Sequence, residues 1–250
     1  MTVFKRRRDD ADSSEEVDDL DSTSEDEVEA APEEPTDPEV DRSEGPFDLT
    51  EAPDDGVARI DFGSLAVPGV DGMDISLEVE EQSQQVVAVT IIIGEGAIQL
   101  QPFAAPRSGG FWPEVRAEMS SGIVESGGTV DEGEGAFGAE LRAVIPAQDE
   151  NGQPATQQAR FVGVEGPRWL LRGVLLGAAA TDARAAEVLE DVFRGCVVSR
   201  GNQPMAPGEL LPLRLPEEAV AAQEDGDGQP EDERPPLDPF ERGPEITEIR

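Results

Sequence analysis

Residues that commonly carry acid–base or nucleophilic chemistry are scarce in this chain of 250 residues. It contains no histidine and no tyrosine, a single cysteine, Cys196, and a single lysine, Lys5. Side chains that titrate near neutral pH are therefore almost absent, and a Ser-His-Asp triad is excluded. A serine nucleophile activated by lysine would depend on Lys5, which precedes a long acidic segment. Because no histidine can activate Cys196, we interpret it as a small buried hydrophobic residue.

Carboxylates are the only abundant groups with catalytic potential. The segment 131–134, Asp-Glu-Gly-Glu, could coordinate Mg²⁺ or provide an acid/base pair, as a metal-dependent hydrolase would require. Flanking glycines indicate an exposed loop with solvated acids instead, and the spacing does not match a calcium-binding loop. Gly94 and Gly96 lack the third glycine, the following helix and the lysine of a phosphate-binding loop. We therefore expect no metal and no cofactor.

Arginines beside a tryptophan form the candidate ligand face of this sequence. Its residues all lie on one predicted hairpin: Arg160, Arg168, Trp169 and Arg172. Arginine next to an aromatic ring can bind a phosphate group or a nucleobase. In the alternative interpretation, Arg160 and Arg172 pair with Glu140 and Glu165 on neighbouring strands. We favour this structural interpretation because residues 56–216 carry a net charge of −11, which opposes binding to nucleic acid.

The C-terminal end regains apolar residues after a featureless acidic stretch. The candidate docking motif consists of Leu237, Phe240, Ile246 and Ile249. Apolar residues that reappear at the end of a disordered tail are typical of short segments that bind a partner. Prolines at positions 235, 236, 239 and 244 stiffen the segment and reduce the entropy lost on docking. A docking motif and a filler sequence are both open at this point.

Charge divides the chain into three segments. Residues 1–55 hold 22 Asp and Glu against 5 Lys and Arg, and residues 217–250 hold 12 against 3. Such acidic, aromatic-poor ends cannot bury enough apolar surface to offset the entropy of ordering them. We therefore expect a disordered acidic N-terminal arm over 1–55 and a flexible acidic tail over 217–250, which ends in the motif at 237–250. Residues 56–216 are numerous enough for a single domain with a hydrophobic core.

The first half of the central segment predicts an antiparallel meander. Residues 57–62 read as a short strand, which glycine and proline interrupt over 63–69. Residues 75–79 alternate between apolar and polar side chains, as a half-buried strand does. Residues 86–93 are apolar on both faces, so we place this strand at the centre of the sheet. A tight turn then leads to another alternating strand over 98–101.

The second half predicts two helices and a second hairpin. Apolar side chains recur at helical spacing over 112–123 and again over 185–193, where Thr181 or Asp182 is the expected N-cap. Gly195 follows the second helix at the position where a helix commonly ends. The predicted strands cover residues 137–145, 160–164, 169–176 and 196–198, the last of which closes the sheet.

The order of these elements predicts an α+β fold, an antiparallel β-sheet meander packed by two main helices. The regular strand–helix alternation of a doubly wound nucleotide-binding sheet is missing. Two known architectures have a similar order of elements, the Mog1/PsbP-like sandwich and the type III secretion chaperone-like fold. The fold alone does not give a function.

Three blocks of the sequence resemble a known family. They are Arg59–Pro68 (RIDFGSLAVP), Gly166–Gly173 (GPRWLLRG) and Asp238–Thr247 (DPFERGPEIT). Together they resemble the actinobacterial family of domain of unknown function 3710, over most of residues 45–216 and at the far C-terminus. The resemblance implies a cytoplasmic bacterial protein without an assigned activity or established site residues. Genes of the family often lie near a dUTPase gene, which implies a link to nucleotide or DNA metabolism.

Three function hypotheses follow. We favour a non-enzymatic cytoplasmic protein that acts through protein–protein contact with a partner that the sequence does not identify. The alternative is an accessory protein of nucleotide or DNA metabolism that uses the arginine face, and the third hypothesis is a carboxylate- or metal-dependent hydrolase. The net charge of −37 disfavours nucleic acid and anionic lipid, and no apolar run has the length of a membrane span. A lone cysteine is typical of a reducing cytoplasm.

Overall fold

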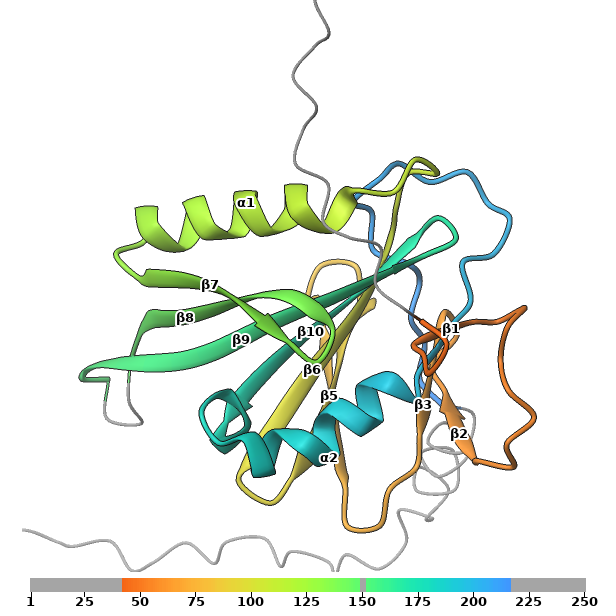
Figure 1. Cartoon of the computed structure of the whole chain (residues 1–250), viewed down its shortest axis with the longest axis horizontal. Helices are drawn as coiled ribbons and strands as arrows, with labels where there is room; N and C mark the ends of the chain where they lie inside the picture. Colours follow the sequence, from red (N-terminus) through yellow and green to blue (C-terminus); the bar gives the residue numbers. More distant parts are fainter. Residues whose placement is uncertain (1–41, 149–151, 217–250) are drawn as a thin grey trace, which may run out of the picture. The chain divides into compact units, whose positions relative to one another are not determined.

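The strands of this protein form one large and one small sheet, described by a computed structural model for residues 42–148 and 152–216. The large sheet is antiparallel and has the order β4-β5-β6-β10-β9-β8-β7 (Figure 1). Its strands are β4 (Asp74–Val79), β5 (Val86–Ile93), β6 (Gly96–Ala104), β7 (Thr129–Gly135), β8 (Gly138–Gln148), β9 (Pro154–Gly166) and β10 (Trp169–Gly177). The small sheet has the order β1-β11-β3-β2, with β1 (Phe47–Asp48), β11 (Val197–Val198), β3 (Leu65–Pro68) and β2 (Arg59–Asp61). The predicted α+β fold with an antiparallel meander is confirmed.

The two predicted helices are α1 (Phe111–Glu125) and α2 (Ala183–Arg194), and a short 3₁₀ helix, η1 (Ala178–Ala180), precedes α2. Asp182 is the N-cap of α2, and its carboxylate accepts hydrogen bonds from the backbone N–H groups of Arg184 (2.7 Å) and Ala185 (3.3 Å). Gly195 follows the helix directly, as predicted. No helix among the described residues combines the length and the apolar character that crossing a membrane requires.

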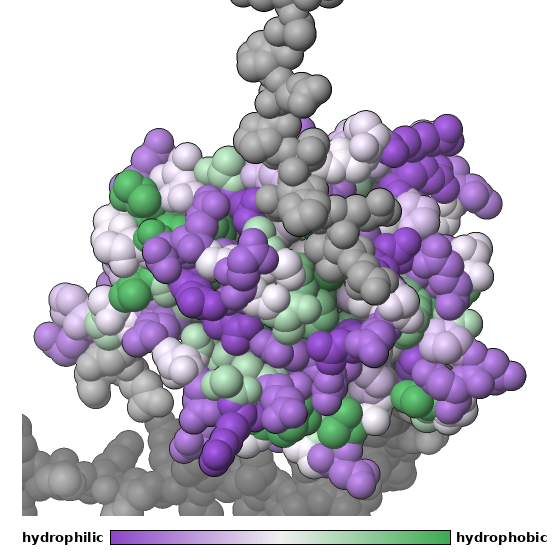
Figure 2. All heavy atoms as spheres, viewed as in Figure 1, coloured by the Kyte–Doolittle hydropathy of each residue, from purple (hydrophilic) through white to green (hydrophobic). Residues whose placement is uncertain are grey.

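The two faces of the large sheet carry different helices. Neighbouring residues of a strand point to opposite faces, so Leu170 and Leu171 of β10 show which helix covers each face. On one face, Leu171 of β10 packs in a core cluster with Leu189 of α2, and the small sheet joins this cluster through Val198. On the other face, Leu170 packs with Trp112 of α1. We call these the α2 face and the α1 face. In the view of Figure 2, apolar side chains on the surface lie in small groups separated by hydrophilic ones.

Two predicted strand positions are wrong. Residues 86–93 were placed at the centre of the sheet, but β5 is second from one edge, and β10 holds the middle position between β6 and β9. The strand at 196–198 was expected to close that sheet, whereas β11 pairs with β1 and β3 in the small sheet. The pairing of β10 with β6 and the pairings of β11 with β1 and β3 join residues far apart in the sequence, which local patterns do not specify.

Three further segments differ from the sequence analysis. Residues 65–68, interpreted as part of a break, form β3, and the segment 131–134, interpreted as a loop, lies in the edge strand β7. The fold also includes residues before position 56, where the sequence analysis began the central domain. Asp48 of β1 is buried, and its Oδ2 accepts a hydrogen bond of 2.9 Å from Nε1 of Trp169. The rest of the expected arm and the tail with its docking motif lie outside the described residues.

Candidate functional site

The four residues of the candidate ligand face are not brought together. Trp169 is fully buried on the α2 face, where Arg160 also lies, one strand away on β9. Arg172 points to the α1 face, where it donates a hydrogen bond to Gln101 and its guanidinium lies 5.0 Å from the centre of the Phe103 ring. Burial lowers the pKa of Arg172. Arg168 lies at the turn between β9 and β10.

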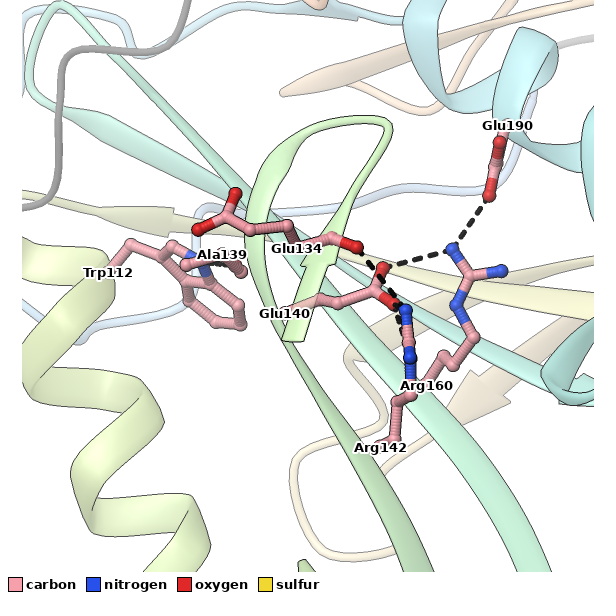
Figure 3. Close-up of polar contacts among 7 residues, drawn as sticks. All are labelled: Trp112, Glu134, Ala139, Glu140, Arg142, Arg160 and Glu190. Atoms are coloured by element: carbon pink, nitrogen blue, oxygen red, sulfur yellow. Dashed lines mark hydrogen bonds and ion pairs between the residues drawn. The ribbon is translucent and has the colours of Figure 1, made fainter. Parts of the chain in front are cut away.

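Arg160 belongs to a cluster of ion pairs between β8, β9 and α2 (Figure 3). Its Nη2 lies 3.0 Å from Oε2 of Glu140 and 2.7 Å from Oε1 of Glu190, and Arg142 also pairs with Glu140 at 2.8 Å. Burial acts to lower the pKa of Arg160, but the hydrogen bonds to Glu190 and Glu140 outweigh it and raise the pKa. Glu140 is almost completely buried, so removal of its arginine partners would leave an uncompensated buried charge and destabilise the fold. The predicted pairing of Arg160 with Glu140 is confirmed.

The predicted pairing of Arg172 with Glu165 is wrong. Oε1 of Glu165 instead accepts a hydrogen bond of 2.7 Å from the backbone N–H of Trp112, in the first turn of α1. Gly110, the N-cap of this helix, has a left-handed backbone (φ 77°) and offers no side-chain hydrogen bond. The carboxylate of Glu165 therefore accepts a hydrogen bond from a backbone N–H that has no partner within the helix. Its negative charge also interacts favourably with the positive end of the helix dipole.

The remaining sequence candidates have structural positions. Cys196 is fully buried, as predicted, and its Sγ donates to the carbonyl oxygen of Val192 at 3.3 Å. Burial raises the pKa of this thiol far above its ordinary value. The acids of 131–134 lie along an edge strand, and the described residues contain no group of three or more potential ligands that could hold a metal ion.

A pocket of about 810 Å³ lies at the N-terminal end of α1, and we call it the α1 pocket. Its walls come from four separate parts of the chain: Arg42, residues within 106–113, residues within 134–139, and residues within 163–168. The first helical turn, the tip of the β7–β8 hairpin and the tip of the β9–β10 hairpin thus converge here. A volume of this size is within the range of ligand-binding sites in proteins.

Trp112 fixes the relative position of the helix and the two hairpins. Its indole Nε1 donates a hydrogen bond of 2.8 Å to the carbonyl oxygen of Ala139 in β8 (Figure 3). Its ring packs closely against Gly163, where an added Cβ would lie only 2.5 Å from the ring. A glycine is therefore required at position 163 for the close approach of α1 to β9.

Three arginines, Arg42, Arg107 and Arg168, line the α1 pocket. Arg42 pairs with Glu51 at 2.9 Å and its guanidinium lies 5.6 Å from the centre of the Trp169 ring, while Arg107 is exposed. Two acids, Glu134 and Glu165, also line the pocket, and Glu165 is engaged with the helix. The lining therefore has an excess of positive charge in a chain of net charge −37.

Arg168 has a left-handed backbone, with φ of 65°. It follows Pro167 at the turn position where glycine is usual. Its carbonyl oxygen accepts a hydrogen bond of 3.2 Å from Nε of Arg200, and its Nη2 reaches the carbonyl oxygen of Gly201 at 3.5 Å. Arg168 thus lines the pocket with a backbone conformation that is unfavourable for residues other than glycine.

Sequence reasoning did not find this pocket, because its walls come from segments up to 126 positions apart. One signal was available: the pair Pro167-Arg168 at the tip of a predicted hairpin places a non-glycine residue where a positive φ is common. The lining residues include no histidine, cysteine, lysine or tyrosine, and their only hydroxyl belongs to Ser108.

The structure shows an α+β domain with a pocket beside its first helix, which three arginines and two glutamates line. The family described as Protein of unknown function (DUF3710) matches residues 45–222, and this chain belongs to it, as the resemblance predicted. The match begins just before β1, in agreement with a fold that starts ahead of residue 56. Among curated proteins, none matches this chain.

Proposed function

We propose that this chain is a non-enzymatic cytoplasmic protein that binds a protein partner, and that the α1 pocket receives an acidic segment of that partner. The observation that carries the proposal is the position of Arg168, which lines the pocket at a cost to its backbone. A left-handed conformation costs a non-glycine residue roughly 1–2 kcal/mol. Such strain is concentrated at functional sites, where a side chain is needed in one place.

Charge supports an anionic ligand. Three guanidinium groups line the α1 pocket, whereas the described fold as a whole is acidic. Arginine binds carboxylates through two parallel hydrogen bonds, which makes it better suited than lysine to recognise an acidic side chain. An acidic partner segment would therefore bind at this place and be repelled by most of the remaining surface.

The apolar lining supports a peptide rather than a small ion. Trp112 and three prolines, Pro106, Pro113 and Pro167, contribute to the walls. Their rings provide apolar surface against which an apolar side chain of a ligand can pack. The preferred occupant thus combines carboxylates with an apolar anchor.

The other two hypotheses have less support. An accessory role in nucleotide or DNA metabolism relied on one arginine face, but Arg160 and Arg172 lie on opposite faces of the sheet. A carboxylate- or metal-dependent hydrolase relied on the acids of 131–134, which follow one edge strand.

The test is a comparison of partners captured from the native host. The full chain, the Arg168→Ala variant and the matched control Arg184→Ala, which removes a guanidinium from the exposed start of α2, serve as baits. We expect a partner that is retained by the full chain and by the control, lost with Arg168→Ala, and cross-linked to the pocket through an acidic segment. Equal capture by all three baits would contradict the proposal.

A further inference from the structure

We propose that this chain's own residues 237–241, Leu-Asp-Pro-Phe-Glu, bind in the α1 pocket and compete there with the acidic segment of the partner. The inference rests on the proposed function, because it assigns an internal competitor to the same site. It gives the C-terminal docking motif a specific position on the fold.

The chemistry of this segment matches the pocket. Phe240 is an apolar anchor placed between two acids, Asp238 and Glu241. The apolar walls of the pocket include a tryptophan and three prolines, and its lining has three arginines against two glutamates. Among the described residues, Arg107 and Arg168 form no ion pair, whereas Arg42 pairs with Glu51. Pro239 directly precedes the anchor and restricts the backbone before binding, which lowers the entropy lost on docking.

The other phenylalanine outside the described residues does not fit. Phe4 is followed by the basic run Lys5–Arg8, which the arginines of the pocket repel. Of the two terminal phenylalanines, Phe240 alone has acidic neighbours on both sides. Charge complementarity therefore selects the C-terminal segment as the occupant.

The chain is long enough for the segment to reach the pocket. The described residues end at Pro216, and twenty residues, 217–236, separate this point from Leu237. An extended chain spans about 3.3 Å per residue, so these twenty reach up to about 66 Å. A folded unit of about 170 residues has a radius of gyration of roughly 16 Å, so every point of its surface is within reach.

Tethering makes even weak binding effective. A connection of this length gives the segment an effective concentration on the order of 1 mM at the pocket. If the free segment binds with a Kd of about 10 µM, the ratio of filled to empty pockets in the tethered chain is about 100. The apparent affinity of an external acidic segment is then reduced by about the same factor.

The test uses a fluorescent synthetic peptide of residues 235–250 and four versions of the full chain, with fluorescence anisotropy as the measurement. The versions are the unchanged chain, Phe240→Ala, the control Phe4→Ala and the double variant Phe240→Ala with Arg168→Ala. Phe240→Ala empties the pocket, so we expect it to bind the peptide at least tenfold more tightly than the unchanged chain and the Phe4→Ala control. The double variant should lose at least tenfold of that affinity. Arg107→Ala, at an exposed position, replaces Arg168→Ala if the latter impairs folding.

Each contrary result has a distinct meaning. Equal peptide affinity of Phe240→Ala and the unchanged chain would overturn the inference, as would binding that does not depend on either pocket arginine. A dimer that sedimentation detects in the unchanged chain and not in Phe240→Ala would overturn the intramolecular arrangement, because the segment would then fill a second copy. Absence of peptide binding to every version would also overturn it. The proposed function is decided separately, by whether partner capture depends on Arg168.

Discussion

The buried carboxylate of Asp48 is expected to hold the first strand of the fold in place. Asp48 lies in β1, ahead of the segment that the sequence analysis assigned to the domain. Its Oδ2 accepts from the indole of Trp169 at 2.9 Å, and its Oδ1 accepts from the backbone N–H (2.9 Å) and the hydroxyl (2.6 Å) of Thr50. Asp48→Ala removes all three hydrogen bonds at once.

The cost of this change follows from burial. Trp169 is fully buried, so its N–H loses its partner without gaining water, which costs about 1–3 kcal/mol. The two bonds to Thr50 are only partly buried and together contribute about 1 kcal/mol. Asp48→Ala should therefore lower the free energy of unfolding by about 2–4 kcal/mol. Asp54→Ala, an equal charge change at an exposed position, should cost less than about 0.5 kcal/mol.

The contribution of Asp48 also depends on pH. Burial acts to raise the pKa of Asp48, but the hydrogen bonds from Thr50 and Trp169 and the charge of Arg42 outweigh it, so the pKa lies below its ordinary value. The unfolded chain, with an ordinary pKa of about 3.9, then binds the proton more readily. The stability due to the carboxylate is fully present above this value and is lost as the pH falls through the pKa of the folded state. Asp48→Asn should therefore differ most from the unchanged chain near neutral pH. The difference should begin to shrink below about pH 4 and vanish only below the lowered pKa of the folded state.

Urea unfolding followed by circular dichroism measures both effects, at neutral pH and through a series of acidic buffers. Trp169→Phe provides the second side of a double-mutant cycle, because it removes the donor and leaves the acceptor. An Asp48→Ala variant as stable as Asp54→Ala, or a difference that does not change with pH, would refute the assignment of β1 to the folded core.

Two further predictions concern a strand and the hairpin tip. Val89→Asp places an unpaired charge at a fully buried position of β5, which costs several kcal/mol, so circular dichroism should detect no cooperative unfolding transition; a soluble variant with an unchanged melting temperature would contradict this. Arg168→Gly should be more stable than Arg168→Ala by about 1 kcal/mol in urea, because only glycine adopts a φ of 65° without strain; equal stability of the two variants would show that the backbone at this turn is relaxed.

The helices were predictable because their signals are local. The apolar stripe of α2 and its N-cap lie within a few turns of chain. Asp182, one of the two expected residues, is the N-cap, and Leu189, Val192 and Phe193 of the stripe are buried, although Val188 is exposed. The pairing of β10 with β9 is a local hairpin and was predicted, but its pairing with β6 joins distant residues and was not predictable in this way. Apolar residues on both faces of β5 indicated burial correctly but did not determine its place in the strand order.

The division of the candidate ligand face could have been derived from the sequence. In the hairpin, Gly166 pairs with Trp169, so every even-numbered residue of one strand pairs with an odd-numbered residue of the other. Paired residues of neighbouring strands lie on the same face of the sheet. Even-numbered residues of β9 and β10 consequently face opposite sides, which separates Arg160 from Arg172. The four-residue turn expected from the sequence gives the same parity. The α1 pocket, in contrast, depends on long-range contacts between the helix and two hairpins, which no local pattern contains.

The tip of the β9–β10 hairpin combines two roles that substitutions can separate. Gly163 and Glu165 position α1, one by allowing the Trp112 ring to approach and the other by binding the first turn of the helix. Changes at these two residues would alter the pocket and the fold together. Arg168 follows them by a few positions. The hydrogen bond from its side chain to the carbonyl oxygen of Gly201 is long, at 3.5 Å, and its backbone conformation is costly. The hydrogen bonds described for Arg168 do not require an arginine side chain at this position. The proposed function supplies a reason for one, since it places a guanidinium in the α1 pocket.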